Sequence, residues 1–263
     1  MNNLDKKLGE IKNRKRIGIM AHVVVGYPSI ATTIETVKTM AASGVDIVEL
    51  QIPFSDPLAD GPTIMKACEK SLENGTKVKD AFATMKKLSS EVSIPLLFMA
   101  YYNTLFVYGV EQFCRDARDA GATGLIVPDM PIDEESEEHF YKFCKQYDLH
   151  TIHVLSPAST ENRLQKNAHV ANGFVYCTAR QGTTGAKEQL DPKLGSYLQK
   201  MKKYFSVPIA VGFGISKKEH LVMLQENAEI AVIGSAVIDV INYSKAEEIQ
   251  KNVRGFFQEL MVQ

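Results

Sequence analysis

Residues 48–62 read VELQIPFSDPLADGP, an apolar run followed by a loop rich in proline and aspartate. Side chains alternate between the two faces of a strand, so the three apolar residues of the run share one face, and Glu49 and Gln51 share the other. Pro53, Pro57 and the later Gly-Pro pair break regular structure after the run. The segment therefore predicts a buried strand that carries two polar side chains on one face and ends in a long loop.

The same unit recurs along the chain, because short apolar runs alternate with segments of helical, 3.6-residue periodicity. An open doubly wound sheet is the alternative, but it would normally have fewer strands and a Gly-rich turn after the first strand, where this chain reads GYPS (26–29). Eight strands alternating with helices instead predict an α/β protein, a single (β/α)8 TIM barrel over residues 1–263 with an extra N-terminal helix at about 2–13. The eight expected strands are 17–26, 45–52, 94–101, 123–129, 150–155, 173–179, 207–213 and 229–235.

Composition limits the classes of function. The chain has 263 residues, of which 45% are hydrophobic and 23% are charged, as in ordinary globular proteins. Its formal net charge of −1 gives no electrostatic reason to expect nucleic acid or an anionic membrane as a partner. No apolar run approaches the roughly 20 residues of a membrane-spanning helix, and the charged N-terminus does not resemble a signal peptide. A cytoplasmic protein is expected.

The spacing of the four cysteines, and of the histidines in the expected strands, does not match that of a metal site. Cys68, Cys114 and Cys144 lie in helical patterns and are expected to be buried free thiols. Cys177 lies near a strand end, but no neighbouring histidine marks it as a catalytic thiol. A metal site was considered for His22 and His153, which lie within strand runs. Without a second inward carboxylate, core or rim histidines are the favoured interpretation, and no metal is expected.

Two acids carry the chemical prediction, since working residues of such barrels follow the C-terminal ends of the strands. An ionised carboxylate facing a barrel interior is costly to bury, and such a group is suited to proton transfer. The alternative for Glu49 is a structural ion pair, but the strand runs offer no obvious inward Lys or Arg. The alternative for Asp60 is an N-cap of the helix that begins near Pro62. On local sequence alone the two interpretations of Asp60 are evenly balanced.

The segment VELQIPFSDPLADGP is similar to the signature of the tryptophan synthase α subunit family. The resemblance extends over the whole barrel, through AYYN (100–103), VPDMP (127–131), ARQGTTGAK (179–187), VGFGIS (211–216) and IGSA (233–236). It implies a lyase that cleaves indole-3-glycerol phosphate to indole and glyceraldehyde 3-phosphate by a retro-aldol reaction. By the same resemblance, Glu49 protonates indole C3 and takes the proton of the glyceryl 3-hydroxyl, and Asp60 accepts a hydrogen bond from the indole N–H.

A phosphate site is expected from the loops after strands seven and eight, because backbone N–H groups and a helix N-terminus bind phosphate there in many barrels. The glycines of GFG (212–214) and GSA (234–236) allow close backbone approach. The segment Arg180–Leu190 is polar and contains glycine, as a mobile lid would. The resemblance implies that it closes over the substrate and that Thr184 hydrogen-bonds the catalytic aspartate. The substrate-binding residues implied by the resemblance are Tyr101, Tyr176, Thr184, Gly185, Phe213, Gly214, Gly234 and Ser235.

The resemblance also implies a partner, a tryptophan synthase β subunit in an α2β2 assembly, with pyridoxal phosphate on that partner and no cofactor on this chain. Two positions depart from the family pattern. Gln51 replaces a usual glycine and is expected either to hydrogen-bond Glu49 or to occupy the space that a glycine leaves open. Tyr27 replaces a usual acid in the first loop. The rival functions are a phosphosugar isomerase or epimerase on the same barrel, and a subunit retained mainly to regulate its partner.

Overall fold

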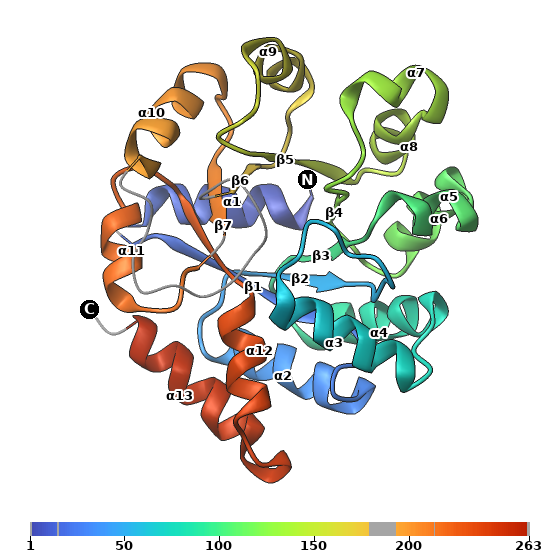
Figure 1. Ribbon diagram of the computed structural model, residues 1–263, viewed down its shortest axis with the longest axis vertical. Helices are drawn as coiled ribbons and strands as arrows, with labels where there is room; N and C mark the ends of the chain where they lie inside the picture. Colours follow the sequence, from blue (N-terminus) through green and yellow to red (C-terminus); the bar gives the residue numbers. More distant parts are fainter. Residues whose placement is uncertain (1, 15, 179–192, 213, 262–263) are drawn as a thin grey trace.

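The computed structural model describes residues 2–14, 16–178, 193–212 and 214–261. Its eight parallel strands pair in chain order and close into a barrel (Figure 1). The predicted (β/α)8 barrel is confirmed and the open sheet is excluded, because β1 pairs with β8 as well as with β2. The strands are β1 Gly18–Val24, β2 Ile47–Gln51, β3 Leu96–Met99, β4 Gly124–Ile126, β5 His150–Leu155, β6 Val175–Thr178, β7 Ile209–Gly212 and β8 Ile230–Ile233.

The helices form a ring around the strands (Figure 1). Among the described residues, no helix is both long and apolar enough to cross a membrane. The segment EEHFYKFCKQY (137–147) has helical periodicity and predicts one helix, but the helix is divided, because His139 has a left-handed backbone with φ 54° and separates α7 from α8. The helices are α1 Asn3–Asn13, α2 Ile30–Ala42, α3 Pro62–Glu73, α4 Val78–Glu91, α5 Tyr102–Tyr108, α6 Val110–Asp119, α7 Glu135–Glu138, α8 Phe140–Gln146, α9 Glu161–Val170, α10 Leu194–Tyr204, α11 Lys218–Leu224, α12 Ser235–Asn242 and α13 Ile249–Met261, with 3-10 turns η1 Ile132–Glu134 and η2 Ala246–Glu248.

The core has two layers, which follow the alternation of the strands. The apolar residues of β2 at 48 and 50 pack with the surrounding helices in one large cluster, together with Ile52 just beyond the strand. Ile47 belongs instead to a second cluster that fills the barrel interior. Glu49 and Gln51 therefore face inward as predicted, and both are almost completely buried. The alternation that hides the apolar face of β2 under the helices thus places a carboxylate and an amide inside the barrel.

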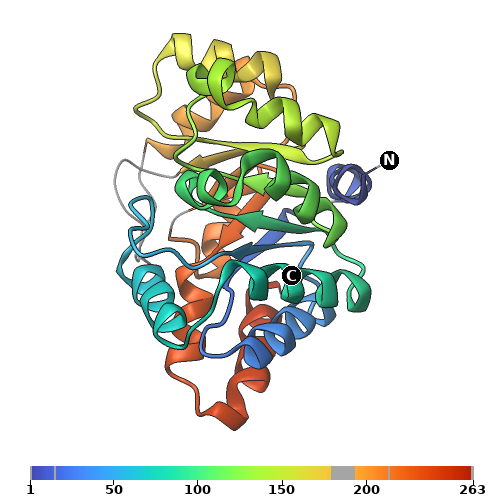
Figure 2. The same cartoon turned by 90° about the vertical axis from the view of Figure 1, so that its right-hand side faces the viewer.

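The N-terminal helix α1 closes one end of the barrel. Its apolar residues Leu4, Leu8 and Ile11 belong to the cluster of the barrel interior. A close approach makes this packing possible, because a Cβ on Gly18 would lie 2.7 Å from Ile11 Cδ1. Figure 2 shows α1, beside the N-terminus, at one end of the barrel. The predicted extra helix is therefore confirmed, and it seals the end at which the strands begin.

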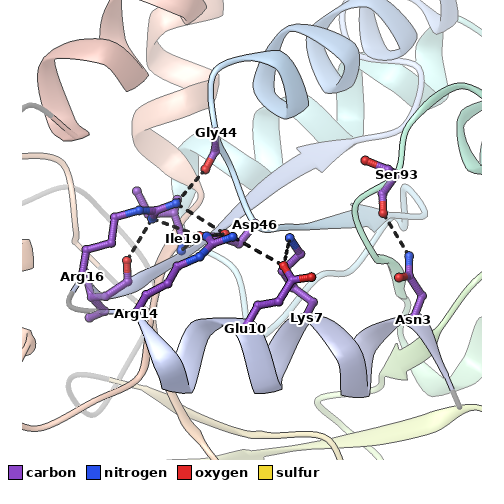
Figure 3. A network of polar contacts seen from close by, with 10 residues as sticks. Asn3, Lys7, Glu10, Arg14, Arg16, Ile19, Gly44, Asp46 and Ser93 are labelled. Atoms are coloured by element: carbon purple, nitrogen blue, oxygen red, sulfur yellow. Dashed lines mark hydrogen bonds and ion pairs between the residues drawn. The ribbon is translucent and has the colours of Figure 1, made fainter.

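A buried carboxylate fastens this closed end. Asp46 is 2% exposed, and its side chain accepts the backbone N–H of Ile19 at 3.0 Å. The guanidinium groups of Arg14 and Arg16 bind the same carboxylate, at the junction between α1 and β1 (Figure 3). Because Asp46 directly precedes β2, this network ties the N-terminal segment to the starts of two neighbouring strands. A carboxylate with two cationic partners and a backbone donor is well compensated for its burial.

Candidate active site

Glu49 lies in β2 and is held by a histidine of the neighbouring strand. His22 of β1 is its register partner, and His22 Nδ1 lies 2.9 Å from Glu49 Oε1. Both side chains are almost fully buried. The other oxygen, Oε2, is also buried and has no hydrogen-bond partner among the described residues. Because Glu49 lines the cavity inside the barrel, one carboxylate oxygen is fixed while the other is left for a bound molecule.

His22 carries an altered proton affinity. Burial lowers its pKa, because the imidazolium ion loses its hydration. The hydrogen bond to Glu49 and the negative charges of Glu49 and Asp60 act in the opposite direction, and together they raise the pKa of His22 above its ordinary value. The neighbouring acids therefore outweigh burial, and this imidazole binds its proton more tightly than an ordinary histidine does.

Asp60 lies in the loop between β2 and α3 and is 5% exposed. Its Oδ2 accepts hydrogen bonds from Gln51 Nε2 at 2.7 Å and from the Tyr101 hydroxyl at 2.9 Å. The N-cap of α3 is Gly61, followed by Pro62, and no side chain caps this helix. The interpretation of Asp60 as a helix cap is therefore wrong. Its side chain turns back into the barrel and lines the same cavity as Glu49.

Burial raises the pKa of Asp60, because the ionised carboxylate loses water. The charge of His22 and the hydrogen bonds from Gln51 and Tyr101 lower it in part, and the nearby charge of Glu49 raises it further. The net direction is upward. Two carboxylates that share one buried cavity thus each have a neighbour that compensates for burial: an imidazole for Glu49, and neutral donors for Asp60.

Gln51 settles an alternative that the sequence leaves open. Its amide is completely buried and bonds Asp60, not Glu49. Tyr101 binds the same carboxylate, and its hydroxyl also accepts the backbone N–H of Ala59 at 3.0 Å. The ring of Tyr101 stacks on Phe54, with centroids 5.4 Å apart. The expected substrate-binding residue Tyr101 is thus placed behind Asp60, where it supports the carboxylate and the loop that carries it.

A cavity that opens to solvent lies at the C-terminal ends of the strands, and the space between its lining residues, including this open part, is about 590 Å³. Glu49, Asp60 and His22 supply its acid–base groups, and apolar side chains form much of the remaining wall. A flat aromatic ring fits such a wall, because only a few polar groups interrupt the apolar surface. Its lining residues are His22, Glu49, Ala59, Asp60, Ile64, Met99, Ile126, Pro128, Val154, Tyr176, Gly214, Val232, Gly234 and Ser235.

Four of the expected substrate-binding residues gather at this cavity. Gly234 is the N-cap of α12 and Ser235 is its first residue, so the helix N-terminus faces the cavity. Gly214 has a φ of +90°, a conformation that side chains rarely adopt. Tyr176 packs tightly against β7: a Cβ atom on Gly212 would lie only 2.3 Å from the Tyr176 hydroxyl. The structure thus brings residues of β6 and of the segments after β7 and β8 together at one cavity.

The remaining predicted site residues lie outside the described residues. These are Thr184, Gly185 and Phe213, and the expected lid Arg180–Leu190 lies outside them as well.

The cysteines and the other strand histidine do not join the site. All four cysteines are buried free thiols, as predicted for Cys68, Cys114 and Cys144, and burial raises the pKa of Cys177 to about 12. His153 stacks on Tyr141, with ring centroids 5.2 Å apart, and burial lowers its pKa to about 4. Across the described residues, no group of three or more His, Cys, Asp or Glu side chains is arranged to hold a metal ion.

The partner of Glu49 is what the sequence argument misses. His22 was expected to be a core or rim histidine, yet it makes the ion-pair contact with the inward carboxylate. The available signal is the strand alternation, since Met20 and His22 of β1 share a face as Ile47 and Glu49 of β2 do. The parallel pairing of the two strands then places His22 opposite Glu49. A search restricted to inward Lys and Arg overlooks this basic side chain.

Comparisons with known proteins agree on one family. The family model described as tryptophan synthase alpha chain matches residues 8–261. The tryptophan synthase alpha chain of Desulfotalea psychrophila is 44% identical over 239 residues, covering 91% of this chain and 93% of that protein. The corresponding chain of a Thermoanaerobacter species is 36% identical and covers 99% and 98%. A solved tryptophan synthase chain of Mycobacterium tuberculosis superposes with a TM-score of 0.89 at 28% identity, covering 98% of this chain and 96% of the other.

Proposed function

The chain belongs to the tryptophan synthase α chain family, and from this premise we propose that Glu49 and Asp60 are its catalytic residues. The protein is a lyase of tryptophan biosynthesis that cleaves indole-3-glycerol phosphate to indole and glyceraldehyde 3-phosphate. One observation carries the assignment: two buried carboxylates from one strand–loop segment face a single cavity, and each is held through one oxygen.

Glu49 moves the proton in this proposal. The protonated carboxyl gives its proton to indole C3, and the resulting carboxylate takes the proton of the glyceryl 3-hydroxyl. The carbon–carbon bond then breaks, its electron pair returns to the indole ring, and glyceraldehyde 3-phosphate leaves as the aldehyde. Because Glu49 ends the cycle protonated again, the reaction consumes no net proton. The cavity position of Glu49, with its second oxygen unbonded among the described residues, supports this role.

Asp60 stabilises charge. Protonation at C3 makes the indole nitrogen positive, and a fixed carboxylate that accepts the indole N–H lowers the energy of that state. Gln51 and Tyr101 both donate to Oδ2, so Oδ1 is the oxygen assigned to the indole N–H. A carboxylate held by two donors needs little reorganisation when the charge appears.

The phosphate of the substrate is assigned to the other side of the cavity. The backbone N–H groups at the start of α12, at Gly234 and Ser235, together with Gly214, form its proposed cradle. The N-terminus of a helix favours an anion. Tyr176 lines the space between phosphate and ring in this arrangement.

The proposed partner is a β subunit that carries pyridoxal phosphate, in an α2β2 assembly. No proposed step needs a cofactor on this chain. Exposed apolar side chains at the cavity end of the barrel support a docking surface there: Leu58 is 84% exposed, Phe106 61% and Val107 78%. Leu58 lies on the loop that carries Asp60, so contact with the partner has a direct structural route to the catalytic carboxylate.

Purified chain mixed in excess with indole-3-glycerol phosphate is expected to release indole in a single turnover, slowly alone and faster with a β subunit. Rapid mixing with detection of indole measures the rate, and Leu58→Asp is expected to remove the acceleration without changing the rate alone. Absence of indole release in both conditions would contradict the proposed catalysis. Stimulation of the partner without indole release would identify a subunit retained for regulation.

Gln51→Gly is expected to lower kcat about tenfold while the protein stays folded. The reason is that Asp60 loses one of the two donors that hold it, and a hydrogen bond to a charged group contributes about 1.5–3 kcal/mol. Gln51→Leu, which keeps most of the volume but removes the donor, is expected to behave alike. Steady-state kinetics and thermal unfolding measure the two effects. Unchanged kcat in both variants would show that Gln51 does not orient Asp60, and a collapse of Tm would show a purely structural residue.

A further inference from the structure

His22 is a buried titratable group that the reaction as described does not use. It lies in β1, is 3% exposed, and lines the cavity. Its Nδ1 bonds Glu49 Oε1 at 2.9 Å, while its Nε2 is buried and has no hydrogen-bond partner among the described residues. An imidazole in direct contact with a proton-transferring carboxyl is able to exchange a proton with it. That contact is the starting point of the inference.

Among the described residues, the charged groups that act on His22 are acids. Glu49 and Asp60 are the two carboxylates that act on it, the first from β2 and the second from the following loop. The Tyr176 hydroxyl faces both carboxylates, and burial, then their charges, raise its pKa, so that it stays neutral. Gln51 of β2 and Gly234 at the start of α12 are its uncharged neighbours. Among the described residues that line the cavity, none is Lys or Arg. Among these described lining residues, His22 is thus the one basic side chain.

We propose that His22 is a positioning residue that holds Glu49 through Oε1 and stores the proton that Glu49 delivers to the substrate. The proposal rests on the proposed role of Glu49 as the proton-transferring group. His22 and Glu49 act as one unit that carries a single proton at the start of each cycle.

The proton balance of this unit is simple. At rest the proton lies on His22 Nδ1 and Glu49 is ionised. Transfer along the Nδ1–Oε1 bond gives a neutral imidazole and a protonated Glu49. A half-turn of the carboxyl group then brings the protonated oxygen to the side of the substrate, where Glu49 passes its proton to indole C3. The Glu49 carboxylate then takes the proton of the glyceryl 3-hydroxyl, and transfer back to Nδ1 restores the resting state. No proton is gained from or lost to solvent, and no oxidant or co-reactant takes part.

The expected pH dependence follows from the contact with Glu49. Burial alone lowers the pKa of His22, and the bond and charge of Glu49 raise it above the ordinary value. The resting proton is therefore present below this raised pKa and is lost as the pH rises through it. Without the imidazole, a carboxyl alone has to keep the proton, and carboxyls release protons at lower pH than imidazoles do. The alkaline limit of activity then moves to lower pH.

A nuclear magnetic resonance titration of the side-chain nitrogens tests the unit without substrate. The full chain is compared with Glu49→Gln, and the His22 signal is assigned by its loss in His22→Asn. In the unaltered protein His22 is expected to protonate above pH 6.5, the ordinary value. In Glu49→Gln its pKa is expected to fall by at least about one unit, since the charge and the ionic bond are gone. Equal values in the two proteins would overturn the proposal, whether or not the enzyme releases indole.

The pH profile of kcat tests the catalytic part. In His22→Asn the amide Nδ2 replaces Nδ1 as the hydrogen-bond donor to Glu49. The amide does not titrate, so it cannot store the proton. The alkaline limit of this variant is expected to move down by about one pH unit or more. At pH values above both limits its kcat is therefore expected to be lower by at least about tenfold, with KM nearly unchanged. His22→Phe, which removes the donor as well, is expected to lower kcat at the optimum too. His153→Asn, another buried strand histidine, is the matched control with an unmoved limit. An unmoved limit in His22→Asn would overturn proton storage.

Discussion

Glu49→Gln is expected to lower the single-turnover rate of indole release by about three orders of magnitude, because general acid–base catalysis by one side chain contributes about 10²–10⁴-fold. The amide has nearly the size and shape of the carboxyl, and it still offers an oxygen to His22 Nδ1. It cannot give a proton to C3 or take one from the 3-hydroxyl. Replacing one carboxyl oxygen by an NH2 group therefore removes both proton transfers of the cycle.

Two further measurements make this result specific to chemistry. The affinity for the product glyceraldehyde 3-phosphate, measured by calorimetry, is expected to stay within about threefold, because the phosphate is held on the other side of the cavity. The thermal midpoint is expected to fall only modestly, because the amide keeps the volume of the carboxyl and His22 can release its proton instead of staying buried as an unpaired cation. An indole rate within tenfold of the original would exclude Glu49 as the proton carrier.

Asp60→Asn is expected to lower kcat by about 10²-fold, a size typical for the loss of one preorganised electrostatic contact. The reason lies in how Asp60 is held. Gln51 and Tyr101 both donate to Oδ2, so the asparagine oxygen has to occupy that position and its NH2 group the position of Oδ1. A donor then faces the indole N–H, which is also a donor. The variant loses the anion and presents the wrong hydrogen-bonding group.

Asp56→Asn is the matched control for this experiment. Asp56 lies in the same loop but is exposed, and its side chain bonds its neighbour Ser55. Its kcat is expected to stay within twofold of the original. The split between kcat and KM separates charge stabilisation from loop damage, because a disordered loop would raise KM as well. Equal kinetics of the two variants would contradict the assignment of Asp60.

The fold was predictable because its signal is local. Each strand of the barrel is an apolar run of a few residues, and periodicity distinguishes it from the helix that follows. The strand ends were predicted too long, as β4 shows: residues 123–129 were expected and Gly124–Ile126 pair. The apolar run continues past the last ladder bond there, and apolar character does not mark where pairing stops. The division at His139 was missed because the apolar pattern continues through the break, while the backbone there is left-handed.

The site was predictable in part, for a physical reason that differs between residues. Glu49 is located by alternation within one strand. Asp60 has the same local sequence as a helix cap, and only the three-dimensional position of Gln51 and Tyr101 shows where its side chain turns. The contact between His22 and Glu49 depends on the register between β1 and β2. The sequence of either strand by itself does not encode that register. Contacts between segments distant in sequence are therefore what the local patterns leave out.

The closed end of the barrel has an evolutionary consequence. Asp46 and its two arginines, with α1 packed into the interior, secure the end at which the strands begin, while the cavity is built from the opposite strand ends and their loops. Perturbations at well-separated places tend to add without interacting. Substitutions in the loops can therefore alter substrate preference without disturbing the packing of α1. The stability that this helix contributes at the opposite end of the barrel remains available to offset their cost.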